Sequence, residues 1–145
     1  MLEQILSDIT PPPDRDGRIL HGFSNNEDAV LVKAPPAGLA LVQTVDILGP
    51  IGNDARLFGQ TAAANALSDV YAMGGRPWSV MNIAAFPSPS SESDTPLSVL
   101  AEILSGAMEK VAESGAVLAG GHTLDDEWIK FGLSVTGVID PARAA

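Results

Sequence analysis

Three aspartates in this sequence stand where a cation could be held: Asp28, Asp46 and Asp69. Each lies where a predicted helix or strand meets a loop or pocket. If the three carboxylates converge, they would suit Mg²⁺, which takes a few carboxylates and completes its octahedron with phosphate oxygens and water. The structural alternative makes Asp28 a turn residue, Asp46 a strand-end cap and Asp69 a solvated helix residue. Any one of them alone favours that alternative, so the metal hypothesis depends on all three.

The helix that would carry Asp69 is predicted over most of residues 59–77. Apolar residues recur there at steps of three and four, which is the period of an α-helix with one buried sector. Within that sector Thr61, Asn65 and Asp69 follow one another at one-turn intervals and share a face. An amide and a carboxylate placed in this way either satisfy a buried hydrogen-bond network or present oxygens to a cation.

A second candidate feature is the segment Gly120-Gly121-His122-Thr123, which follows a short apolar stretch. Its backbone amides could approach a phosphate closely, because glycines leave room for it. The alternative is a tight turn with no ligand. His122 either contacts the phosphate or forms a local hydrogen bond, and His21 is assigned no chemical role.

The elements that must position these residues are expected in the order β-β-α-β-α-β-β, after a short N-terminal helix. Strands are predicted at residues 29–33, 39–46, 78–86, 116–119 and 131–139, and a second long helix at residues 97–113. The first two strands are expected to form a hairpin, and residues 120–123 to end the fourth strand. This order predicts an α+β domain with helices packed on one face of a mixed β-sheet.

Composition limits the functions open to this chain of 145 residues. Hydrophobic residues make up 46% and charged residues 18%, which is typical of one globular domain. The net charge of −10 argues against a nucleic-acid backbone as ligand, although divalent cations can still bridge carboxylates to a nucleotide. The absence of cysteine excludes a disulfide, a thiolate metal site and a thiol nucleophile. With no signal peptide and no apolar run long enough for a membrane span, a cytoplasmic protein is expected.

Four stretches of the sequence resemble one enzyme family. AANALSDVYAMGGRP (residues 63–77) resembles the signature of an ATP-binding superfamily that includes aminoimidazole ribonucleotide synthetase, thiamine-monophosphate kinase and selenophosphate synthetase. The other three resemble selenophosphate synthetase (selenide, water dikinase) in sequence and in spacing: EDAVLV (27–32), LVQTVDILGPI (41–51) and LAGGHTLDD (118–126). The similarity covers nearly the whole chain.

This resemblance implies a reaction in which ATP, selenide and water give selenophosphate, AMP and phosphate, with Mg²⁺ required. It also implies a homodimer in which the sheets of two subunits pair into a barrel with helices outside. Carried over residue by residue, Asp28 and Asp69 match magnesium ligands, and Asp46 matches an aspartate of the nucleotide–metal site. The residues that match ATP contacts are Asn25, Asn26, Glu27, Asp46, Asp69, Gly121, His122 and Thr123, of which the last three reach the nucleotide from the partner subunit.

The sequence also departs from that family. The family has a glycine-rich segment with a reactive cysteine or selenocysteine and a lysine, and a second domain, and neither is found in these 145 residues. Residues 1–145 are therefore expected to form a single N-terminal domain for ATP binding and dimerisation, inactive alone and without a catalytic residue of its own. Two alternatives stay open: a related kinase of a small metabolite, and a dimerisation domain whose carboxylates are structural.

Overall fold

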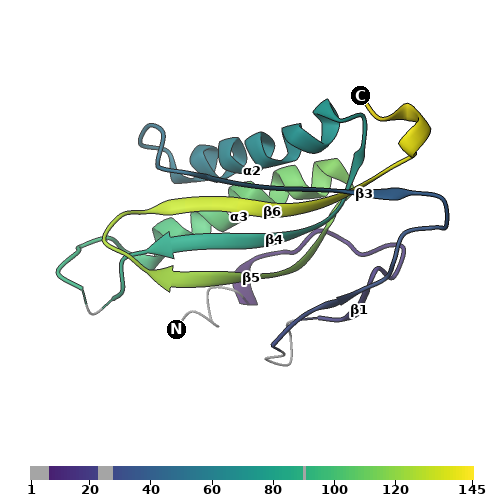
Figure 1. The fold of residues 1–145 in the computed structure, drawn as a ribbon. Coiled ribbons are helices and arrows are strands. Elements are labelled where there is room, and N and C mark those ends of the chain that lie inside the picture. The colour runs from purple at the N-terminus through teal and green to yellow at the C-terminus, as the bar shows by residue number, and fades with distance from the viewer. Residues whose placement is uncertain (1–6, 23–27, 90) are drawn as a thin grey trace.

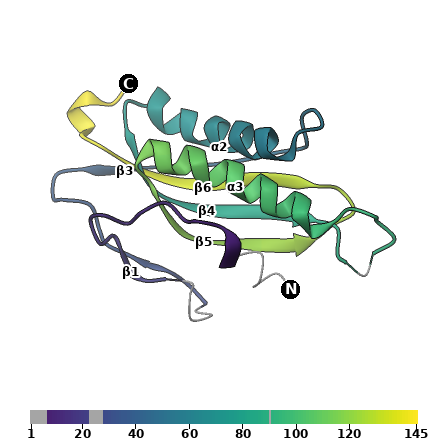
Figure 2. The same cartoon turned by 180° about the vertical axis from the view of Figure 1, so that it is seen from behind.

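The computed structural model of the chain describes residues 7–22, 28–89 and 91–145. Its main part is a four-stranded sheet with two long helices on one face (Figure 1, Figure 2). In chain order the elements are β1 (Ile19–His21), β2 (Leu31–Val32), β3 (Ala40–Leu48), α2 (Ala55–Ala72), β4 (Arg76–Phe86), α3 (Leu97–Ser114), β5 (Val117–Asp125), β6 (Lys130–Ile139) and η2 (Pro141–Arg143). Among the residues that the structure describes, no helix is both long enough and apolar enough to cross a membrane.

The four strands are arranged in the order β3-β6-β4-β5, so β3 and β5 form the two edges of the sheet. Strand β6 pairs antiparallel with β3 and with β4, whereas β4 and β5 run parallel. A parallel pair needs a crossover connection, and α3 provides it between β4 and β5. The prediction of an α+β domain with a mixed sheet and helices on one face is confirmed.

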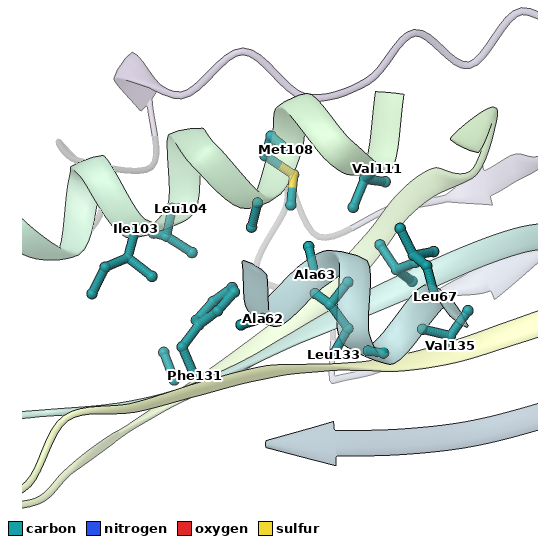
Figure 3. Close-up of a cluster of buried hydrophobic side chains, with 14 of the residues drawn as sticks. Ala62, Ala63, Leu67, Ile103, Leu104, Met108, Val111, Phe131, Leu133 and Val135 are labelled. Carbon is teal, nitrogen blue, oxygen red and sulfur yellow. The ribbon is translucent and has the colours of Figure 1, made fainter. Parts of the chain in front are cut away.

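The core lies between the helices and the sheet (Figure 3). Alternate residues of β6 point toward the helices, and Phe131, Leu133 and Val135 are at most 1% exposed. Successive side chains of a strand point to opposite faces, which explains this spacing of two. Helix α2 meets them with alanines, including the buried Ala62 and Ala63 of Figure 3, and α3 covers them with larger side chains.

Two glycines let the helices α2 and α3 approach each other closely. A Cβ atom on Gly59 of α2 would lie 1.9 Å from the carbonyl oxygen of Ile103, and one on Gly106 of α3 would lie 2.0 Å from that of Arg56. Any other side chain at either position would force the helices apart. On the outer side of this contact, the Gln60 amide donates to Glu109 at 2.6 Å, and the Arg56 guanidinium pairs with the same carboxylate.

Neither α2 nor α3 covers the other face of the sheet (Figure 1, Figure 2). It exposes apolar side chains from two strands: Leu41 (54%), Val45 (57%) and Ile47 (47%) of β3, and Met81 (42%) of β4. On the same face a cavity of about 380 Å³ lies between the sheet and the segment around β2, with Leu41, Met81 and Trp78 among its lining residues. An apolar sheet face of this kind is typical of a surface that another layer covers.

The predicted hairpin between residues 29–33 and 39–46 is wrong. Strand β2 pairs with β1 in a separate two-stranded sheet, and β3 pairs with β6 along all nine of its residues. The chain between β2 and β3 contains Pro35 and Pro36, which have no N–H to donate to a ladder. Instead, the Trp78 indole N–H donates to the carbonyl of Lys33 at 3.2 Å and holds the end of the β2 segment against β4.

The predicted break at residues 120–123 is also wrong, because β5 continues through it to Asp125. Gly121 pairs with Asn82 of β4, and His122 pairs with Ile83. A Cβ atom on Gly121 would lie 2.7 Å from the carbonyl oxygen of Asn82. This glycine therefore allows a close approach between neighbouring strands, and it does not form a turn.

Candidate functional site

Asp46 and Asp69 come from the two elements that run along one edge of the sheet, β3 and α2. In β3 the side chains alternate, with Val42 and Leu48 packed against the core, so Asp46 belongs to the face that α2 covers. In α2, Leu67 and Val70 are buried on either side of Asp69, whose own side chain is exposed. The core packing of both elements therefore fixes the backbone positions from which the two carboxylates extend.

Each of these carboxylates accepts a hydrogen bond from the other element. The Thr44 hydroxyl of β3 donates to Asp69 Oδ2 at 2.7 Å. The Asn65 amide of α2 donates to Asp46 Oδ2 at 3.1 Å. Thr44 and Asp46 are two residues apart on a strand, and Asn65 and Asp69 are one turn apart on a helix, so each pair shares a face. These four side chains form a polar group between β3 and α2, in which each element donates one hydrogen bond to the aspartate of the other.

Within the described part of the chain, no positively charged side chain pairs with the carboxylates of this group. Among the described residues, the ion pairs involve Arg18, Arg56, Lys110 and Lys130, and none of them includes Asp46 or Asp69. At the β5–β6 connection, by contrast, Asp126 is paired with Lys130. The two uncompensated carboxylates offer hard oxygen ligands, and this donor set fits Mg²⁺.

Asp28 does not complete a three-carboxylate site in this chain. Within residues 7–22, 28–89 and 91–145, no group of three or more His, Cys, Asp or Glu side chains is placed to hold a metal ion. Asp28 precedes β2, which belongs to the separate two-stranded sheet and not to the β3 edge. The expected convergence of Asp28, Asp46 and Asp69 is therefore not found within the described part of one chain.

Gly121, His122 and Thr123 lie on β5, at the opposite edge of the sheet from Asp46. Strands β6 and β4 separate the two edges, and three strand spacings amount to about 14 Å. His122 and Gly121 are exposed. Within one chain these residues do not meet the two aspartates, so their contact with a nucleotide stays a prediction that requires a second subunit.

The remaining predicted residues, Asn25, Asn26 and Glu27, lie outside the described residues. Conversely, the structure adds Thr44, which the sequence analysis did not single out. The signal for it was present, since Thr44 and Asp46 alternate with exposed apolar residues and must share a strand face. Thr61, predicted on the same helix face as Asn65, donates its hydroxyl to the Leu57 carbonyl at 2.8 Å and does not join the polar group.

Comparison with known proteins shows the family to which this chain belongs. Residues 26–139 match the family model described as "AIR synthase related protein, N-terminal domain". A selenide, water dikinase of Nitratidesulfovibrio vulgaris (strain DP4) is 54% identical over 140 residues, which are 97% of this chain and 38% of that protein. A selenide, water dikinase of Clostridioides difficile (strain 630) is 47% identical over 143 residues, 99% of this chain and 39% of that protein. The chain thus spans about two fifths of the length of these relatives.

Solved structures agree on the fold. The thiamine-monophosphate kinase of Stenotrophomonas maltophilia K279a matches with a TM-score of 0.73 and 26% identity, over 90% of this chain and 40% of that one. The hydrogenase maturation protein HypE in complex with ATP matches with a TM-score of 0.69 and 17% identity, over 99% of this chain and 41% of that one.

Proposed function

We propose that this chain is the N-terminal part of a selenide, water dikinase. The proposal starts from the fact that the chain belongs to the family described as "AIR synthase related protein, N-terminal domain". The observation that carries the proposal is the uncompensated pair of Asp46 and Asp69, within a chain that is 54% identical to such an enzyme over 97% of its length. The reaction proposed is the one the resemblance implies: ATP, selenide and water give selenophosphate, AMP and phosphate.

In this proposal Asp46 and Asp69 hold Mg²⁺ next to the ATP phosphates. When bound, the ion supplies charge neutralisation on the phosphate oxygens. The chain's own contribution is to fix two carboxylates on a rigid strand–helix pair, and Thr44 and Asn65 hold one oxygen of each. On the family resemblance alone, Asp28 is proposed as a further magnesium ligand, and Asn25, Asn26 and Glu27 are proposed as further contacts to ATP.

A homodimer is part of the proposal, because the described residues leave both edges of the four-stranded sheet unpaired and much of its apolar face exposed. Two copies whose sheets close into a barrel would cover Leu41, Val45 and Met81 and remove the free edges. If β5 of the partner lies beside β3, its segment from Gly121 to Thr123 comes next to the site of Asp46. This arrangement is supported by the placement of the two halves of the predicted site on opposite edges.

A chimeric enzyme tests the proposal. The matching segment of the N. vulgaris dikinase is replaced by this chain, and AMP and phosphate formation is followed with ATP, Mg²⁺ and selenide. We expect selenide-dependent AMP formation, and its loss in the chimera with Asp69→Asn. An inactive chimera that folds and dimerises like the parent would contradict the proposal, and so would full activity of the Asp69→Asn chimera.

The second candidate is a kinase of a small phosphorylated metabolite, which is favoured by the 26% identity to a thiamine-monophosphate kinase. It predicts ADP as the product and a response to thiamine monophosphate in place of selenide. Assaying both substrates on the same chimera separates the two functions.

A further inference from the structure

We infer that Thr44 and Asn65 are positioning residues that hold the Asp69 and Asp46 carboxylates so that each keeps one oxygen for a divalent cation. The inference rests on the proposed function, because that cation is the one proposed to accompany ATP. It starts from the two hydrogen bonds that cross between β3 and α2, at 2.7 Å from Thr44 and 3.1 Å from Asn65.

Each of these two hydrogen bonds runs between β3 and α2, so together they determine how the two carboxylates are placed relative to each other. An aspartate side chain rotates about two torsions, and a hydrogen bond to one oxygen restricts both. Here the bond to the strand aspartate comes from the helix, and the bond to the helix aspartate comes from the strand. The separation of the two carboxylates is therefore tied to the packing of α2 against β3, and Leu48, Leu67 and Val70 contribute to that packing.

Both bonds engage Oδ2 and leave the other oxygen of each carboxylate available. Within the described residues, no hydrogen bond reaches Oδ1 of Asp46 or Oδ1 of Asp69. A carboxylate of this kind can accept a donor on one side and bind a cation on the other. This leaves one oxygen of each aspartate for a metal ion with several water or phosphate ligands, which is how Mg²⁺ is commonly bound.

The chemical nature of the two donors matters as much as their position. A lysine or arginine at either position would orient the carboxylate equally well, but its charge would cancel the charge that attracts a cation. The hydroxyl of Thr44 and the amide of Asn65 are neutral, and no ion pair of the described residues includes either aspartate. The group therefore orients two carboxylates without neutralising them.

The test compares Mg²⁺ binding by variants of the 145-residue chain that keep side-chain shape and lose the donor. Thr44→Val and Asn65→Leu remove the two hydrogen bonds, and Thr44→Ser retains the hydroxyl. Thr61→Val is the matched control, because among the described residues that hydroxyl bonds only to the Leu57 carbonyl of its own helix. Mg²⁺ is titrated alone, and binding is followed through the ¹H–¹⁵N amide signals of residues 44–46 and 65–69.

We expect Thr44→Val and Asn65→Leu each to weaken Mg²⁺ binding by about 10- to 100-fold, the range measured when partners that orient metal ligands are removed. Thr44→Ser should restore the wild-type affinity, and Thr61→Val should not change it. Thermal unfolding of each variant shows that the fold is intact, and if one donor variant fails to fold, the other carries the test.

Three results would overturn the inference. Wild-type affinity in both donor variants would leave the proposed metal role of the aspartates standing and remove only the positioning role. An equal loss in Thr61→Val and Thr44→Val would show a general effect on the helix. If Mg²⁺ causes no saturable shift in the wild-type amides of residues 44–46 and 65–69, the proposed metal role fails, and the inference fails with it.

Discussion

Gly106 of α3 lies directly against the backbone of Arg56 in α2, where a Cβ atom would come within 2.0 Å of the Arg56 carbonyl oxygen. The contact joins two helices that β4 separates in the sequence, and it sets how closely the two helices pack against each other. Helix α2, which carries Asp69, also packs on β3, the strand that carries Asp46.

Because of this contact, we expect Gly106→Ala to destabilise the fold, whereas the same substitution in an exposed helix usually stabilises it. In an exposed helix interior, replacing glycine by alanine stabilises by up to about 1 kcal/mol. Here the added methyl group meets backbone, which cannot rotate away, and we expect the free energy of unfolding to fall by about 1–3 kcal/mol, as for other overpacked sites. Urea unfolding measures the change. Gly49→Ala is the control, because nothing lies within 4 Å of its added Cβ, and equal stability of both variants would contradict the packing argument.

The contacts of Glu109 predict a pH dependence of stability. The Gln60 amide, and after it the Arg56 guanidinium, lower the pKa of Glu109 below its ordinary value of 4.5. The ionised carboxylate therefore stabilises the fold above pH 4.5, and this contribution is lost as the pH falls through the lower folded-state pKa. We expect Glu109→Gln to be less stable than wild type at pH 7 and to approach it at acid pH.

Thermal unfolding of wild type and of Glu109→Gln, from neutral to acid pH, measures this difference in stability. Gln60→Leu serves as a second variant, because it removes the first donor and should move the pKa of Glu109 back toward 4.5. A stability difference between wild type and Glu109→Gln that does not change with pH would contradict the assignment.

The open face of the sheet predicts self-association. We expect the chain to be a dimer by light scattering at micromolar concentration, because Val45 and its apolar neighbours need a covering layer. Val45→Lys should yield monomers, since it would place a charge in the covered face. The control is Leu57→Lys on α2: both residues are similarly exposed, at 57% and 55%, but Leu57 lies on the helical side. A wild-type monomer, or a Val45→Lys dimer, would contradict the barrel arrangement.

The sequence predicted the long elements well, because their patterns are local. The period of α3 ends at Gly115, whose φ of 76° provides the left-handed cap, and the β6 alternation places Phe131 and Leu133 in the core. The predicted hairpin failed because the partner of β3 is β6, which is far away in sequence and whose choice depends on which faces can be buried together. Gly121 was misread because a glycine for close strand approach and a glycine for a turn look alike in sequence.

The candidate site was predictable only in part for the same reason. The shared helix face of Asn65 and Asp69 follows from the period of α2, and the structure confirms that both side chains lie along one strand. The partner that each finds on β3 depends on the register between helix and strand, which no local pattern specifies. Asp28 was grouped with the other two aspartates because each was predicted to lie where a helix or strand meets a loop or pocket, and its role stays a prediction.

The central claim is that Asp46 and Asp69 together bind one divalent cation, and Mn²⁺ titration followed by electron paramagnetic resonance tests it most directly. The measurement counts free Mn²⁺ over the wild-type chain, Asp46→Asn, Asp69→Asn and the charge-matched control Glu113→Gln. The account predicts a saturable site in wild type and in Glu113→Gln that is lost or strongly weakened in both aspartate variants. Equal Mn²⁺ binding by all four proteins would contradict it.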